Sequence, residues 1–151
     1  MAVVFEKLFC SNIVHICFGE DVSDMPIEID CLEKVGGSKF VRKTLTLSEA
    51  IQENDRQVIG SAPYKWLNPI YKAARKLTGI KNFTKFQQTI TDNGFRIRAA
   101  IVAYVQERKL GKRKSQVENG VDLLSLFLQD TDVFTDDYIV DELRDFFGAA
   151  A

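Results

Sequence analysis

The side chains best suited to act as metal ligands or nucleophiles are three cysteines and one histidine, which all lie near the start of the chain. They are Cys10, Cys17, Cys31 and His15. The cysteine spacing matches no metal-binding or redox pattern, and the histidine has no second ligand or base beside it. We therefore expect buried, reduced thiols in an intracellular or cytosol-facing protein, and a structural histidine in place of a functional one.

Two other segments could be mistaken for anion-binding sites. Residues 36–38, Gly-Gly-Ser, lack the full glycine pattern and the strand–turn–helix context of a phosphate loop, so they predict a turn. Arg108, Lys109 and residues 112–114 form a basic cluster, but no aromatic residues are interleaved with it and acidic residues flank it. Because the formal net charge is -1, we expect a solvated loop there and no nucleic-acid partner.

The composition describes a globular chain. Apolar residues make up 46% of the 151 residues and charged residues 27%, which excludes a disordered or fibrous protein. The length corresponds to one domain or a piece of one. No apolar run is long enough to span a bilayer, and the first ten residues lack the features of a signal peptide.

Hydrophobic periodicity and capping signals predict a mainly α fold with about six helices and one short, exposed β-hairpin. The expected helices cover 3–18, 46–59, 69–77, 84–109, 121–129 and the segment from Thr135 onward, and the hairpin covers 27–45. The longest helix should bury one continuous face, made of Phe86, Ile90, Gly94, Ile97, Ile101, Tyr104 and Val105. Gly94 in that face would permit another backbone to approach closely, and residues 121–129 are so apolar that we expect several neighbours to bury them.

The last helix has the strongest start signals. Thr135 is placed to cap it, Asp136 and Asp137 favour the positive end of its dipole, and Phe134 and Ile139 are spaced for a hydrophobic staple. Its end is ambiguous in the sequence. Either Gly148 is a C-cap followed by a short alanine tail, or the helix is cut in its middle.

Two consecutive stretches carry a family resemblance. Residues 121–129, Val-Asp-Leu-Leu-Ser-Leu-Phe-Leu-Gln, precede a short loop and then residues 134–150, Phe-Thr-Asp-Asp-Tyr-Ile-Val-Asp-Glu-Leu-Arg-Asp-Phe-Phe-Gly-Ala-Ala. Together they resemble the helix H to helix I junction of the heme-thiolate monooxygenases, the cytochromes P-450. In that family an Asp-Leu-Leu helix is followed by a Phe-Thr/Ser-Asp-Asp/Glu cap and a Phe-Phe-x-Ala-Gly segment over the heme.

The upstream elements follow the same order. Residues 9–21 are similar to helix E and its Phe-Gly stop, 46–60 to helix F, 68–79 to the F–G connection and 84–109 to helix G. The resemblance implies that 1–151 is a single helical segment, an incomplete portion of the cytochrome P-450 fold, with 27–45 as a hairpin insertion. It implies substrate-binding roles for Phe146, Phe147, Ala149 and Ala150 near the pocket and for Ile59 and Pro63 in the lid.

The departures from the family pattern concern catalysis. Ala149 matches the family alanine, but Ala150 stands where glycine is usual, and no oxygen-activating Thr follows. The Glu-x-x-Arg pair and the Phe-x-x-Gly-x-x-x-Cys-x-Gly loop, whose Cys is the axial heme ligand, are both absent. The resemblance therefore implies heme in the parent family, but no heme held by this chain alone, no catalytic residue here and no activity in isolation.

The expected partners follow from the same resemblance. They are the remainder of a monooxygenase chain or neighbouring subunits covering exposed apolar faces, together with a redox partner, at the cytosolic face of the endoplasmic reticulum membrane. The alternative is a non-enzymatic helical accessory or adaptor subunit of a larger assembly. A free-standing ligand-binding helical domain is a third hypothesis, supported only by the apolar character of the chain.

Overall fold

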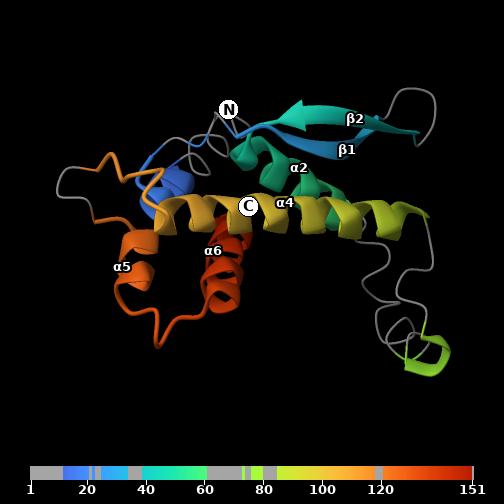
Figure 1. The fold of residues 1–151 in the computed structure, drawn as a ribbon. Helices are drawn as coiled ribbons and strands as arrows, with labels where there is room; N and C mark the ends of the chain where they lie inside the picture. Colours follow the sequence, from blue (N-terminus) through green and yellow to red (C-terminus); the bar gives the residue numbers. More distant parts are fainter. Residues whose placement is uncertain are drawn as a thin grey trace.

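The 25-residue helix α4 (Lys85–Lys109) is the element against which α2, β1 and α6 pack. In Figure 1 the hairpin lies along one side of α4, while α5 and α6 lie on its other side. The computed structural model describes residues 12–20, 22, 25–33, 39–60, 73, 76–79, 85–117 and 121–150, with side chains throughout except at 59–60 and 147–150. Along the chain the elements are β1 (Ile27–Glu33), β2 (Lys39–Leu45), α2 (Leu47–Gly60), α4, α5 (Leu123–Gln129) and α6 (Asp136–Ala150). The predicted mainly α fold with one hairpin is confirmed.

The hairpin pairs β1 and β2 antiparallel, from Ile27 opposite Leu45 to Glu33 opposite Lys39. Ile27, Ile29 and Cys31 are buried, as their alternation with polar residues predicts. The prediction that the hairpin is exposed is wrong for β1, because its apolar face packs on α2 and α4. Its status as an insertion stays a prediction.

A buried asparagine of α4 holds the hairpin in place. Asn93 is fully buried; its Oδ1 accepts from the Asp30 backbone N–H at 2.9 Å and its Nδ2 donates to the Asp30 carbonyl at 2.9 Å. The Asp30 carboxylate also accepts from Arg42 of β2 and Arg96 of α4, each at 3.0 Å. Gln57 of α2 also donates to the Asp30 carbonyl at 3.1 Å, so this central strand residue is bonded to β2, α4 and α2.

Helix α2 begins at the predicted capping box. The Thr46 N–H donates to Glu49 Oε2 at 3.2 Å, and the Glu49 N–H donates to Thr46 Oγ1 at 3.3 Å. Two orphan donors of the first turn are therefore satisfied. Leu47, Ala50 and Ile51 then form the buried face of the helix.

The buried face of α4 agrees with the prediction only in its second half. Buried positions are Thr89, Asn93, Ile97, Ile101, Tyr104 and Val105. Phe86 and Ile90 are only half-buried, because this part of α4 meets the polar backbone of the hairpin and uses Asn93 to bond it. The close approach expected at Gly94 is also wrong, since a Cβ built there meets no atom within 4 Å.

The last two helices have side-chain caps. The Asp122 side chain accepts from the Ser125 N–H at 2.7 Å to cap α5, and Thr135 Oγ1 accepts from the Tyr138 N–H at 3.3 Å to cap α6. Contrary to expectation, α5 is not buried on all sides, because only Leu124 is fully buried and Leu126 is 48% exposed.

Helix α6 buries Ile139, Val140 and Leu143 as its sequence predicts. It also continues through Gly148 to Ala150, so the alternative of a C-cap at Gly148 is wrong.

Two of the other predicted helices are described only in part. Residues 12–18 are helical, and the predicted stop is confirmed: Gly19 has φ 71°, and its N–H donates to the His15 carbonyl at 2.7 Å. Ile16, expected in the buried face, is 60% exposed, and Val14 is buried instead. In the predicted helix 69–77, Leu77 was expected in an apolar face but is 86% exposed.

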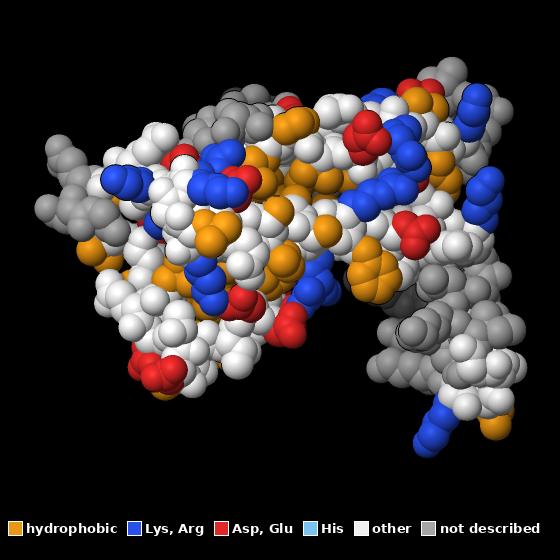
Figure 2. All heavy atoms as spheres, viewed as in Figure 1, with side chains coloured by type: hydrophobic (Ala, Val, Ile, Leu, Met, Phe, Trp, Pro, Cys, Tyr) orange, Lys and Arg blue, Asp and Glu red, His pale blue; other side chains and the backbone are white. Residues whose placement is uncertain are grey.

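On the face shown in Figure 2, basic, acidic and apolar side chains are interspersed over α4. Basic and acidic side chains thus accompany one another on this face, as expected for a chain whose formal net charge is only -1.

Candidate functional site

The substrate-contacting residues implied by the family resemblance are described in one case only. Phe146 lies on α6 with 45% of its surface exposed. Pro63 and the side chains of Ile59, Phe147, Ala149 and Ala150 lie outside the described part of the chain. Their grouping around a pocket therefore stays a prediction.

A hollow of about 170 Å³ lies where α2, α4 and α6 meet. Its lining residues come from all three helices: Ile51, Asn54 and Asp55 from α2, Gly94 and Ile97 from α4, and Arg144 and Asp145 from α6. A cavity of this size fits a small molecule of about one aromatic ring, since about 150 Å³ holds benzene. The missing side chain of Gly94 contributes to this space.

Two acceptors among these lining residues have no donor. Asn54 Oδ1 and Asp55 Oδ2 are both inaccessible to solvent and unbonded. Burial raises the pKa of the Asp55 carboxyl above its ordinary value, and the positive charge of Arg144 opposes this rise. Because both acceptor atoms have almost no accessible surface, they lie behind the wall of the hollow and do not face it.

The sequence carries a weak signal for this hollow. The buried face of α2 runs through Leu47, Ala50 and Ile51, and the helical period predicts further apolar residues one turn later. Polar residues stand there instead, Asn54 among them. This interruption of the apolar face of α2 by polar side chains is the signal in the sequence for the hollow.

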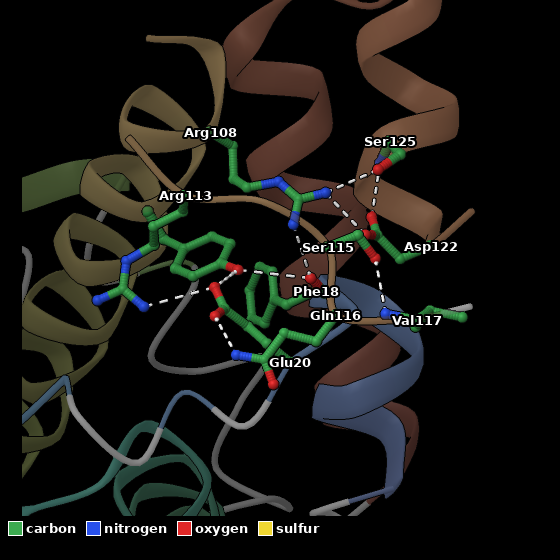
Figure 3. Close-up of polar contacts among 10 residues, drawn as sticks. Phe18, Glu20, Arg108, Arg113, Ser115, Gln116, Val117, Asp122 and Ser125 are labelled. Carbon is green, nitrogen blue, oxygen red and sulfur yellow. Dashed lines mark hydrogen bonds and ion pairs between the residues drawn. The ribbon is translucent and has the colours of Figure 1, made fainter. Parts of the chain in front are cut away.

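A second polar cluster lies at the C-terminal end of α4 (Figure 3). The Arg108 guanidinium donates to the Phe18 carbonyl at 3.1 Å, and its Nη2 donates to Asp122 Oδ2 and Ser125 Oγ, both at 2.7 Å. The Arg108 and Asp122 side chains are 5% and 0% exposed, so this is a buried ion pair.

The charge of Asp122 is well compensated. Burial alone would raise the pKa of its carboxyl, but hydrogen bonds from Ser115, the Ser125 backbone and Arg108 outweigh burial and lower the pKa. The carboxylate therefore stays ionised while it caps α5 and holds Arg108.

The same cluster extends to Tyr104 and Glu20. The buried Tyr104 hydroxyl donates to Glu20 Oε1, and Arg113 Nη1 approaches the same oxygen at 3.4 Å (Figure 3). Burial, followed by the bond to Glu20, raises the pKa of Tyr104 far above its ordinary value, so its hydroxyl stays protonated. The Arg113 guanidinium also lies 5.3 Å from the centre of the Tyr104 ring.

This second cluster is structural in character. It joins the end of helix 12–18, the C-terminal end of α4 and the start of α5, and its charged groups are paired. The prediction of a solvated basic loop is wrong for Arg108 and Arg113, because folding pairs Arg108 with Asp122, and Arg113 with both the nearby Glu107 and the distant Glu20. Gly19 is required here, since a Cβ would lie 2.5 Å from Asp122 Oδ2.

The described cysteines behave as buried thiols, as predicted. Burial, with a smaller effect of the nearby Asp122 charge, raises the pKa of Cys17 to about 12, and burial also raises the pKa of Cys31. A heme thiolate must be deprotonated and open to the iron, so neither residue fits an axial ligand. Cys10 lies outside the described residues, and His15 is exposed, so its structural role stays a prediction.

Within the described ranges, no group of three His, Cys, Asp or Glu side chains could hold a metal ion. Across the same residues, no helix combines the length and apolarity needed to cross a membrane.

Comparisons with protein-family models, with curated proteins and with solved structures found no match to this chain.

Proposed function

We propose that this chain is a segment of a heme-thiolate monooxygenase of the cytochrome P-450 family and is not catalytically competent alone. The observation that carries the proposal is the resemblance of residues 121–150 to the family's helix H to helix I junction. The capped starts of α5 and α6 support it, because the family motif places a short helix, a loop and a newly capped helix in that order. The unbroken course of α6 through Gly148 is also consistent with a helix I.

In this proposal each helix has a place in the substrate-access region. α2 corresponds to helix F, α4 to helix G, α5 to helix H and α6 to the first half of helix I. Phe146, Phe147, Ala149 and Ala150 would then approach the substrate, and Ile59 and Pro63 would belong to the lid.

The iron ligand must come from another part of the parent enzyme. Heme supplies oxygen activation in this family, but the buried, protonated Cys17 and Cys31 do not fit it. We therefore assign no catalytic step to this chain. Its own contribution would be to shape the substrate path and to exclude water from it.

The proposed partners are the remainder of the monooxygenase chain and its redox partner. The proposed location is the cytosolic face of the endoplasmic reticulum membrane, as for the parent family. A non-enzymatic accessory subunit is the second candidate, favoured by exposed apolar side chains on and beside α4, such as Phe95 at 66% and Leu110 at 67% exposure.

The transcript that encodes this chain provides the test. If the proposal is right, the reading frame continues past Ala151 into a Thr, a Glu-x-x-Arg pair and a Phe-x-x-Gly-x-x-x-Cys-x-Gly loop. A stop codon directly after Ala151 would overturn it. In that case, recovery of a fixed set of proteins with the tagged chain would support the accessory subunit.

A further inference from the structure

Three aromatic side chains gather where α5 leads into α6. The rings of Phe127 and Phe134 lie 5.2 Å apart, and the Tyr138 ring lies 6.5 Å from the first and 5.6 Å from the second. Phe127 and Phe134 are half-buried against the core, but Tyr138 is 46% exposed and Val133, next to Phe134, is 64% exposed. We call these four residues the α5–α6 surface. Exposed apolar side chains grouped around aromatic rings are typical of a protein-binding surface.

Carboxylates without basic partners border the α5–α6 surface. The Asp130 carbonyl accepts from the Phe134 N–H at 2.9 Å, so Asp130 and Asp132 belong to the tight turn beside the aromatic rings. Glu142 follows Tyr138 by one turn of α6 and accepts from its hydroxyl. Among the side chains that the structure describes, no Lys or Arg forms an ion pair with any of these three carboxylates.

The surrounding segment is strongly acidic. Residues 121–150 contain eight Asp and Glu residues but one basic residue, Arg144, although the whole chain has a formal net charge of -1. Arg98, Arg108 and Lys109 of α4 pair with four of these acids, so a negative charge remains at this end of the molecule. Such a charge repels nucleic-acid phosphates and anionic lipids, and it attracts a basic partner.

We propose that the α5–α6 surface binds a basic, apolar segment of a partner protein. Lysine or arginine side chains of the partner pair with Asp130, Asp132 and Glu142, and an apolar side chain covers the exposed part of the aromatic cluster. The Tyr138 ring can also receive a cation on its face. The same surface of a second copy would bring like charges together, so it does not fit as the occupant. The proposal uses only charges and exposed side chains of this chain, so it does not depend on the monooxygenase proposal.

The test uses the 151-residue chain and a short synthetic helical peptide of Leu and Lys, with Leu on one face and Lys on the other. One control peptide has Glu in place of every Lys, and a second has Ser in place of every Leu. Binding is measured by calorimetry, and the amide chemical shifts of Val133 and Tyr138 are followed by NMR. Saturable binding of the Leu/Lys peptide is expected, with at least tenfold weaker binding of each control. No saturable binding, or equal binding of either control peptide, would overturn the proposal.

Variants separate the charge from the apolar contact. Asp130→Asn combined with Asp132→Asn should weaken binding of the Leu/Lys peptide at least tenfold, and Tyr138→Ser should weaken it at least fivefold. The matched control combines Glu28→Gln with Asp92→Asn, which removes the same charge from the hairpin and the first half of α4, and should leave the affinity unchanged. All five side chains are exposed, so circular dichroism should show an unchanged fold. Equal weakening by the matched control, or unchanged affinity in Tyr138→Ser, would contradict the assignment.

The oligomeric state tests the alternative occupant. Analytical ultracentrifugation of the chain without peptide should show a monomer. A dimer that Tyr138→Ser dissociates would overturn the proposal, because a second copy would then cover the α5–α6 surface.

Discussion

Replacement of either partner of the buried Arg108–Asp122 pair should be strongly destabilising. Arg108→Met removes three hydrogen-bond contacts and leaves a buried carboxylate without its counter-ion. Asp122→Asn keeps an oxygen to accept from the Ser125 N–H, so it removes the charge but not the cap of α5. Because the two side chains are only 5% and 0% exposed, each single change should lower the free energy of unfolding by about 3–5 kcal/mol.

The double variant measures the coupling between the two residues. With both charges removed, no uncompensated buried charge remains, so the double variant should cost about 2 kcal/mol less than the sum of the single variants. That coupling is large against a total stability of about 5–15 kcal/mol for a domain of this kind. Urea unfolding, followed by circular dichroism at pH 7, gives the change in the free energy of unfolding for each single variant and for the double variant.

Arg98 is the matched control on the same helix. It pairs with Asp137 and Asp141 of α6, whose side chains are 87% and 60% exposed. Arg98→Met should therefore cost no more than about 1 kcal/mol. A cost of Arg108→Met as small as that of the control, or additive single variants, would refute a buried and coupled pair.

Four further predictions concern stability and reactivity. Asn93→Ala should lower the free energy of unfolding by about 1–3 kcal/mol, because it leaves the buried contact of the Asp30 N–H without its acceptor, while the Asp30 carbonyl keeps Gln57 as a donor; no measurable loss in urea unfolding would contradict this contact. Gly94→Ala should raise it by about 0.5–1 kcal/mol, because alanine favours the helix and its Cβ meets no atom within 4 Å; a lower urea midpoint would show that the space is filled. Cys17 should resist iodoacetamide at pH 8 in the native chain and react in urea, as judged by mass spectrometry of its peptide; equal labelling would show an accessible thiol. Since the unfolded thiol ionises near 9.0 but the pKa of Cys17 in the folded chain is about 12, stability should fall as pH rises between these values, and less steeply in Cys17→Ala.

Local signals in the sequence were sufficient for the starts of α2 and α6 and for the hairpin, whereas α5 begins at Leu123, two residues after the predicted start. The Thr46–Glu49 capping box and the Thr135 cap depend on residues within three positions of each other, so spacing alone identifies them. The alternation of Ile27, Ile29 and Cys31 likewise depends only on the period of a strand.

The polar interior could not be predicted in the same way. Asn93 bonds Asp30 across 63 positions of the sequence, and Arg108 bonds the Phe18 carbonyl across 90. No spacing rule connects such residues, so the sequence predicts Arg108 in solvent and gives no signal for the role of Asn93. The hollow has no complete signal in the sequence for a related reason, since its lining comes from three helices that meet only in the folded chain.

The carbon monoxide difference spectrum of the reduced protein tests the central claim most directly. Two samples are compared: the product of the whole reading frame that contains these 151 residues, and the 151-residue chain alone. We predict the heme-thiolate absorbance band in the first sample and none in the second. Absence of the band from the first sample would contradict the assignment to this family, and a band from the second would contradict the conclusion that this chain holds no heme ligand.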